Sequence, residues 1–126
     1  MKTRIENELI ATRNVLVEYP KRYKSLQEEL SKIDSERSDL LHVIELGSLN
    51  AVQRVRLAGE LRDLSIKRRL VKNDIELLKE VTHFAENGVT PGRLNNLIGT
   101  IRQVLQKQEK RSYRLRVRND LQDFMK

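Results

Sequence analysis

Two long runs of apolar residues, spaced alternately four and three positions apart and separated by a short break, constrain this fold most strongly. The first run extends from Ile5 to Ile44 in one phase, and the second from Leu57 to Ala85. This spacing places the apolar side chains on one face of a helix. We therefore predict an all-α fold in which two long helices form an antiparallel hairpin, a coiled coil that turns at residues 46–50.

The break carries signals for a helix end and a helix start. Gly47 suits the left-handed residue that ends many helices, whereas Asn50 and Gln53 have the three-residue spacing of a reciprocal cap. We expect the second helix to start near Ala51. If the turn centres near residue 48, Arg37 would face residues 59–60 and Arg68 would face Glu28 or Glu29.

A third helix follows a second break. Gly88 ends the return arm, and Thr90 with Pro91 gives a hydroxyl cap followed by proline at the first helical position. The predicted organisation is one elongated helical domain over residues 1–126, with a helix arm at 1–46, a return arm at 50–87 and a third helix with a basic tail at 90–126. Pro20 interrupts the first arm without changing its phase, which favours a kink within one rod.

Composition supports this fold class and excludes several kinds of site. Charged residues are 34% of the chain and aromatic residues 4%, which favours an elongated helical protein. The absence of cysteine excludes disulfides and thiolate zinc sites, and no catalytic or phosphate-binding motif is present. We expect no enzyme activity, no cofactor and no metal. Without a signal-like start or a run of about 18 apolar residues, we expect a cytoplasmic protein that does not contact membranes.

Positive charge is concentrated after the break. Residues 1–47 hold 8 basic and 9 acidic side chains, so the net charge of +7 arises from the rest of the chain. Such asymmetry is typical of a protein with an anionic partner.

The strongest candidate binding segment is the basic run at residues 107–118. Its cations outnumber the single Glu109, and clustered Arg and Lys side chains suit phosphate or carboxylate groups. Its apolar residues alternate with arginines, which allows a short strand or a segment ordered by a partner, but we favour helix because helical spacing resumes near the end. The candidate residues are Lys107, Lys110, Arg111, Tyr113, Arg114, Arg116 and Arg118.

A second candidate patch lies on the return arm, where Arg62, Arg69 and Lys72 share one outward helix face. The same arm carries apolar residues outside the hairpin seam, and these predict a homodimer interface. The third helix could instead fold back and cover them within one chain. The candidate interface residues are Ile66, Leu70, Leu77, Val81 and Phe84.

The residues around the break resemble small helical-hairpin proteins of phages and prophages of Gram-positive bacteria. The resemblance rests on DLLHVIEL at 39–46, LNA at 49–51, RR at 68–69 with Lys72, and IELL at 75–78. It implies an accessory role in the host cytoplasm and assigns no site residue. The functional hypothesis is a non-enzymatic inhibitor or modulator of a host protein or nucleoprotein, such as a CRISPR or other defence nuclease. The alternatives are direct DNA or RNA binding through the C-terminal basic segment and a structural oligomerisation module.

Overall fold

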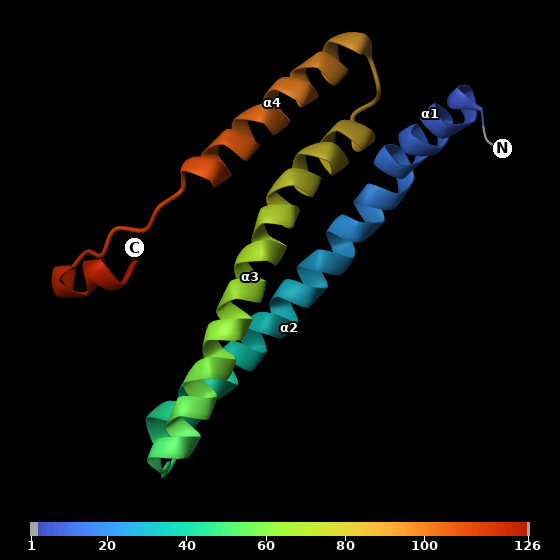
Figure 1. The fold of residues 1–126 in the computed structure, drawn as a ribbon. Helices are drawn as coiled ribbons and strands as arrows, with labels where there is room; N and C mark the ends of the chain where they lie inside the picture. The colour runs from blue at the N-terminus through green and yellow to red at the C-terminus, as the bar shows by residue number, and fades with distance from the viewer. Residues whose placement is uncertain (1–2, 126) are drawn as a thin grey trace.

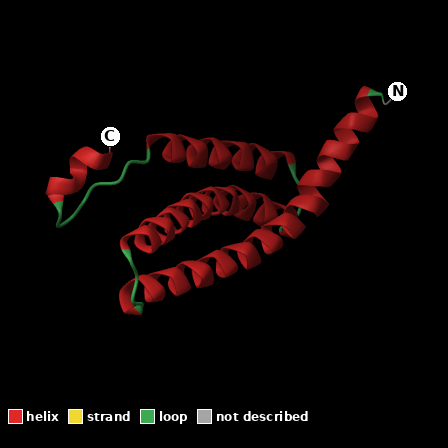
Figure 2. Cartoon of the chain, turned by 60° about the horizontal axis from the view of Figure 1, so that its bottom comes forward, coloured by secondary structure: helices red, strands yellow, loops and turns green. Residues whose placement is uncertain are grey.

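The computed structural model describes residues 3–125, and within this range the regular secondary structure is all helix, with no strand (Figures 1 and 2). The all-α prediction is therefore confirmed for this part. The predicted domain of residues 1–126 begins and ends outside the described residues. The elements are α1 (Arg4–Arg13), a π-helical turn η1 (Asn14–Glu18), α2 (Tyr19–Leu46), α3 (Ala51–Glu86), α4 (Pro91–Lys110) and a 3₁₀ helix η2 (Asn119–Met125).

The centre of the molecule is the contact between α2 and α3. Figure 1 shows α3 beside α2, joined to it at the lower end by residues 47–50. Leu26 and Ile33 of α2 are buried against Val71 of α3, and burying such a side chain stabilises the fold by about 1.5–3 kcal/mol. Four partly buried residues pack around this cluster: Leu30, Leu64, Ile75 and Leu78.

The connection between α2 and α3 combines a close backbone approach with a cap. The Asn50 side chain accepts a hydrogen bond from the Gln53 backbone N–H at 2.8 Å, and the Gln53 side chain accepts one from the Asn50 N–H at 3.1 Å. The predicted left-handed conformation of Gly47 is wrong, because its φ is −81°. Glycine is needed there for another reason: a Cβ would lie 2.6 Å from the Val43 carbonyl oxygen.

Polar contacts between α2 and α3 differ from those predicted for Arg37 and Arg68. Arg37 donates to Ser65 at 3.3 Å, and Arg68 donates to Asp34 at 2.6 Å. The predicted partners of both arginines are wrong, since their long side chains reach groups at another level of the facing helix. A third cross-helix contact joins Lys67 to Glu29 at 3.5 Å.

The distortion near Pro20 lies in the turn before it. Pro20 cannot donate a hydrogen bond, and in a regular helix its ring would clash with the Leu16 carbonyl four residues earlier. The chain forms the wider turn η1 here, in which the Tyr19 N–H donates to the Asn14 carbonyl. Figure 2 shows that the helix changes direction between α1 and α2.

The third helix, α4, lies against the upper part of α3 (Figure 1). Its start follows the sequence signals: Gly88 has a φ of 91°, and the Thr90 hydroxyl accepts from the Arg93 N–H at 3.2 Å. At its other end, the Gln108 side-chain amide donates to Asn73 O and Glu76 Oε2, each at 3.2 Å. The Gln108 contacts hold the last turns of α4 against α3.

The prediction of a third helix that continues through residues 90–126 is wrong beyond Lys110. Residues 111–118 form no helix, and η2 is a separate short 3₁₀ helix. A continued helix would stack like charges at spacings of four, as in Lys110, Arg114 and Arg118, and such pairs destabilise helices. The apolar residues of this segment alternate with its cations, so they form no helical stripe that could offset the repulsion.

Candidate partner-binding surfaces

The basic segment, residues 107–118, consists of the last turn of α4 and the extended chain that follows it (Figure 1). Its extended part is folded against η2: the Leu115 N–H donates to the Gln122 side chain at 3.1 Å, and Gln122 donates to the Tyr113 carbonyl at 3.4 Å. Leu115 is half-buried there. All seven predicted binding residues of the segment are exposed: Lys107, Lys110, Arg111, Tyr113, Arg114, Arg116 and Arg118.

Two of the six cations in the basic segment are paired. Arg111 lies 3.6 Å from Glu76, and Arg118 forms two hydrogen bonds to Asp120 at 2.9 and 2.6 Å. The hydrogen bond from Arg118 lowers the pKa of the Asp120 carboxyl, and the same contact raises the pKa of Arg118. The other four form no ion pair within residues 3–125 and are open to anionic groups: Lys107, Lys110, Arg114 and Arg116.

The second predicted patch lies on α3, separate in sequence from the basic segment. Arg62, Arg69 and Lys72 are exposed, and none forms an ion pair in the described part of the chain. Their neighbours Lys67 and Arg68 are paired instead with Glu29 and Asp34 of α2. The three outward cations therefore remain available for a partner.

The predicted dimer stripe on α3 is divided by α4. Val81 and Phe84 are 9% and 7% exposed, whereas Ile66 and Leu70 are 49% and 61% exposed. Phe84 lies with Leu97 of α4 around one groove, and Leu77 and Val81 lie with α4 residues around another. The third helix thus covers the upper residues within the same chain, the alternative that the sequence left open.

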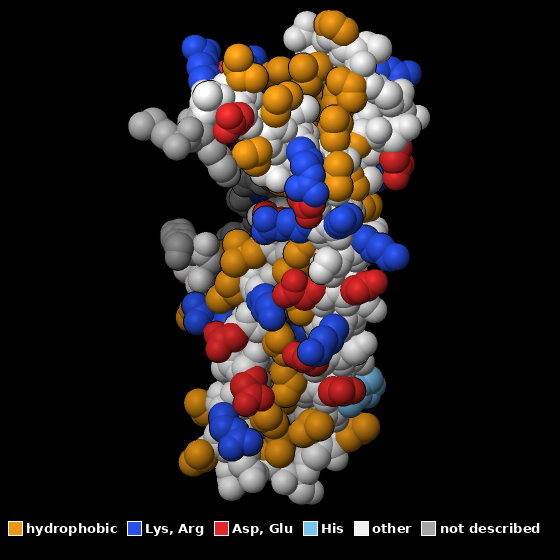
Figure 3. All heavy atoms as spheres, turned by 90° about the vertical axis from the view of Figure 1, so that its right-hand side faces the viewer, with side chains coloured by type: hydrophobic (Ala, Val, Ile, Leu, Met, Phe, Trp, Pro, Cys, Tyr) orange, Lys and Arg blue, Asp and Glu red, His pale blue; other side chains and the backbone are white. Residues whose placement is uncertain are grey.

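Exposed apolar side chains also gather at the lower end of the molecule. Figure 3 shows them at the end where α2 connects to α3, with acidic and basic side chains mixed along the middle of the same face. Near this end of α2 the exposed apolar residues are Leu41, Val43, Ile44 and Leu46. The last turns of α2 therefore pack less completely than its centre.

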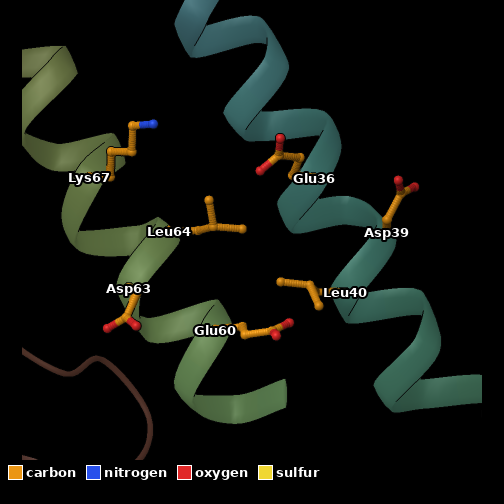
Figure 4. Close-up of a pocket in the computed structure, with 7 residues that line it drawn as sticks. All are labelled: Glu36, Asp39, Leu40, Glu60, Asp63, Leu64 and Lys67. Carbon is orange, nitrogen blue, oxygen red and sulfur yellow. The ribbon is translucent and has the colours of Figure 1, made fainter. Parts of the chain in front are cut away.

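An acidic groove of about 540 Å³ between α2 and α3 was missed from the sequence. Figure 4 shows Leu40 and Leu64 directed toward each other across it, with Glu36 and Glu60 beside them. The remaining residues around the groove are Asp39, Asp63 and Lys67. The available signal was a pair of carboxylates three positions apart on each arm, of which Glu36 and Glu60 lie beside the two leucines once the helices are aligned.

Other site types find no geometric support in residues 3–125. This range holds no group of three or more His, Asp or Glu side chains placed to bind a metal ion. It also holds no helix with the length and apolarity needed to cross a bilayer.

Comparisons with protein-family models, with curated proteins and with solved structures find no match to this chain.

Proposed function

We propose that this chain is a non-enzymatic interaction protein that binds an anionic partner through the basic segment. In this proposal α2 and α3 form an antiparallel hairpin that serves as a rigid scaffold. α4 packs against the upper part of α3 and positions the basic segment. A preordered scaffold reduces the entropy lost on binding, and clustered cations accelerate the encounter with a negative surface.

The observation that carries the proposal is the set of four exposed cations without an ion pair in the described chain. Lys107, Lys110, Arg114 and Arg116 lie within ten positions of one another. Carboxylates or phosphates placed between these cations offset their mutual repulsion. The long side chains of Lys and Arg allow the charged groups to reach such anions. A solvated helix surface would instead carry acidic residues at spacings of three and four, and here only Glu109 is present.

The test compares two matched pairs of arginines. Arg114→Gln/Arg116→Gln removes two charges from the basic segment, and Arg54→Gln/Arg56→Gln removes two exposed charges at the same spacing from the start of α3. Binding is measured by fluorescence anisotropy with a labelled polyglutamate peptide and with labelled DNA and RNA, over a series of salt concentrations. The first variant should bind at least one probe about tenfold more weakly, and the control should bind normally. Equal losses would contradict the proposal.

Direct nucleic-acid binding is the second candidate, and Tyr113 is the observation that favours it. This side chain is exposed beside Arg111 and Arg114, where a ring can stack on a base while the cations contact phosphates. For the oligonucleotides, log K should fall linearly with log salt, and Tyr113→Ala should weaken binding without changing that slope. Lack of oligonucleotide binding at low salt would remove this candidate.

The protein-partner version draws on the resemblance to phage and prophage proteins. A modulator of a host nucleoprotein, such as a defence nuclease, is the partner class that this resemblance implies. The salt series separates the versions, because a protein surface recognised through shape as well as charge loses less affinity with added salt than phosphates do.

A further inference from the structure

Helix α3 carries a second apolar stripe outside its contact with α2. We call Leu77, Val81 and Phe84 the upper stripe, and Val52, Val55, Ile66 and Leu70 the lower stripe. Consecutive members of the two stripes are three, four, seven or eleven residues apart, and these spacings place their side chains on one face of the helix. The upper stripe is covered by α4, whereas Val52 and Val55 are 78% and 74% exposed.

The lower stripe continues the interface between α3 and α4 beyond the point where α4 stops. Gln108, near the end of α4, is held at Asn73, and the exposed positions begin at Leu70. From Leu70 to Val52 the stripe runs about 27 Å along the helix, at ~1.5 Å per residue. Gly59 lies in its middle, and a Cβ added there would meet nothing within 4 Å, so a partner backbone could approach closely. A helix of about five turns fits this length.

One edge of the lower stripe is basic. Arg62 and Arg69 follow Val55 at intervals of seven residues, so all three lie along the same line of the helix surface. Both arginines are exposed, and neither forms an ion pair within the described range. An occupant of the stripe therefore meets two unpaired guanidinium groups along this edge.

Electrostatics and sterics disfavour a second copy of this chain as the occupant. An antiparallel copy centred on the stripe would place Arg62 against the partner's Arg62 near the two-fold axis, and like charges in an interface oppose binding. A parallel copy would bring both α4 helices into the same space. The chain's own residues 111–118 carry four arginines, and their positive charge would be repelled by Arg62 and Arg69. This segment is therefore also disfavoured as the occupant.

We propose that the lower stripe is a docking site for an amphipathic helix of a different protein. The helix would place apolar side chains on Val52 and Val55 near one end and on Ile66 and Leu70 near the other, cross Gly59 between the two pairs, and carry carboxylates along the edge that meets Arg62 and Arg69. This surface is separate from the basic segment. The two proposals can therefore fail independently.

The test uses two labelled 18-residue helical peptides with the full-length protein. Both carry leucines at helical spacing; one has glutamates along one edge, and the other has lysines at the same positions. Fluorescence anisotropy should show the glutamate peptide binding at least about tenfold more tightly than the lysine peptide. Arg62→Glu/Arg69→Glu should reverse this preference. Equal binding of both peptides, or an unchanged preference in the variant, would overturn the proposal.

Matched variants locate the binding surface. Ile66→Glu/Leu70→Glu should abolish binding, whereas Leu41→Glu, an exposed apolar position on α2, should leave it unchanged. The substituted positions are exposed, so circular dichroism should show the wild-type helix content. If Arg114→Gln/Arg116→Gln removes peptide binding instead, the peptide binds the basic segment and the proposal fails.

The other occupants of the stripe give distinct results. Sedimentation equilibrium should show a monomer at micromolar concentration, and a dimer that Leu70→Glu dissociates would assign the stripe to a second copy. If Leu121→Glu/Phe124→Glu strengthens peptide binding about tenfold, the chain's own C-terminal segment competes for the stripe. Either result would overturn the proposal, and peptide affinity unchanged by the second variant would support it.

Discussion

The upper and lower halves of α3 carry apolar residues on the same helix face but have different surroundings. In the upper half, α4 buries Val81 and Phe84; in the lower half, Ile66 and Leu70 face solvent. The difference arises because α4 has 20 residues and α3 has 36, so the covering helix stops partway along the stripe. A periodic pattern therefore identifies an apolar face, but the length of the neighbouring element decides whether the chain itself covers it.

The largest expected effect on the free energy of unfolding comes from removing the Phe84 side chain. Phe84→Ala should lower the free energy of unfolding by about 3 kcal/mol, because it leaves a cavity between α3 and α4. The matched substitution in the exposed half, Ile66→Ala, should change it by less than about 0.5 kcal/mol. Urea denaturation followed by circular dichroism measures both, and equal losses would show that α4 does not cover the upper stripe.

A chemically identical pair sharpens the comparison. Val81→Ala and Val52→Ala each remove two methyl groups from the same stripe. The first should lower the free energy of unfolding by about 1.5 kcal/mol, at ~0.8 kcal/mol for each buried carbon removed, and the second should have little effect. Thermal unfolding of the two variants should show a lower midpoint for the Val81 variant alone.

The lower boundary of the covered half depends on Gln108. Gln108→Ala removes the hydrogen bonds to Asn73 and Glu76 and should destabilise the end of α4 by about 1 kcal/mol. Hydrogen exchange should become faster in the last turns of α4, whereas Gln106→Ala, at an exposed position, should leave it unchanged. Unchanged exchange in the Gln108 variant would place the boundary elsewhere.

The smallest expected effect concerns the contact between Arg118 and Asp120, beyond α4. The contact with Arg118 lowers the pKa of Asp120 from 3.8. The stability that this contact contributes to the folded state is therefore complete above pH 3.8 and is lost as the pH falls through the lower folded-state pKa. In an NMR titration, Arg118→Gln should raise the pKa of Asp120 toward 3.8. An unchanged pKa would show that this pair does not form in solution.

Local sequence signals predicted the helix ends well. The cap of Asn50 with Gln53, and the start of α4 at Thr90 and Pro91, depend on residues within a few positions of one another. Gly47 shows the limit of such signals, because a glycine that ends a helix can serve a close backbone approach as well as a positive φ. The predicted continuation of the third helix beyond Lys110 is wrong because repulsion between cations four residues apart outweighs the helical spacing that resumes near Phe124.

The candidate surfaces were only partly predictable, since they depend on contacts distant in sequence. The exposed positions of the basic-segment residues follow from their charge, and what binds them stays a prediction. The acidic groove requires Glu36 and Glu60 to lie across two helices. The division of the α3 stripe requires the place where α4 ends, which Gln108 fixes by bonding to Asn73.

Cysteine labelling tests the half-covered stripe most directly, because the chain has no cysteine of its own. Leu70→Cys and Val81→Cys place single thiols eleven residues, or about three turns, apart on one face of α3. With a thiol-reactive dye under native conditions, the cysteine at position 70 should react at nearly the rate of the unfolded chain. The cysteine at position 81 should react at least about tenfold more slowly, since it becomes accessible only when α4 detaches. Equal rates at the two positions would contradict the account.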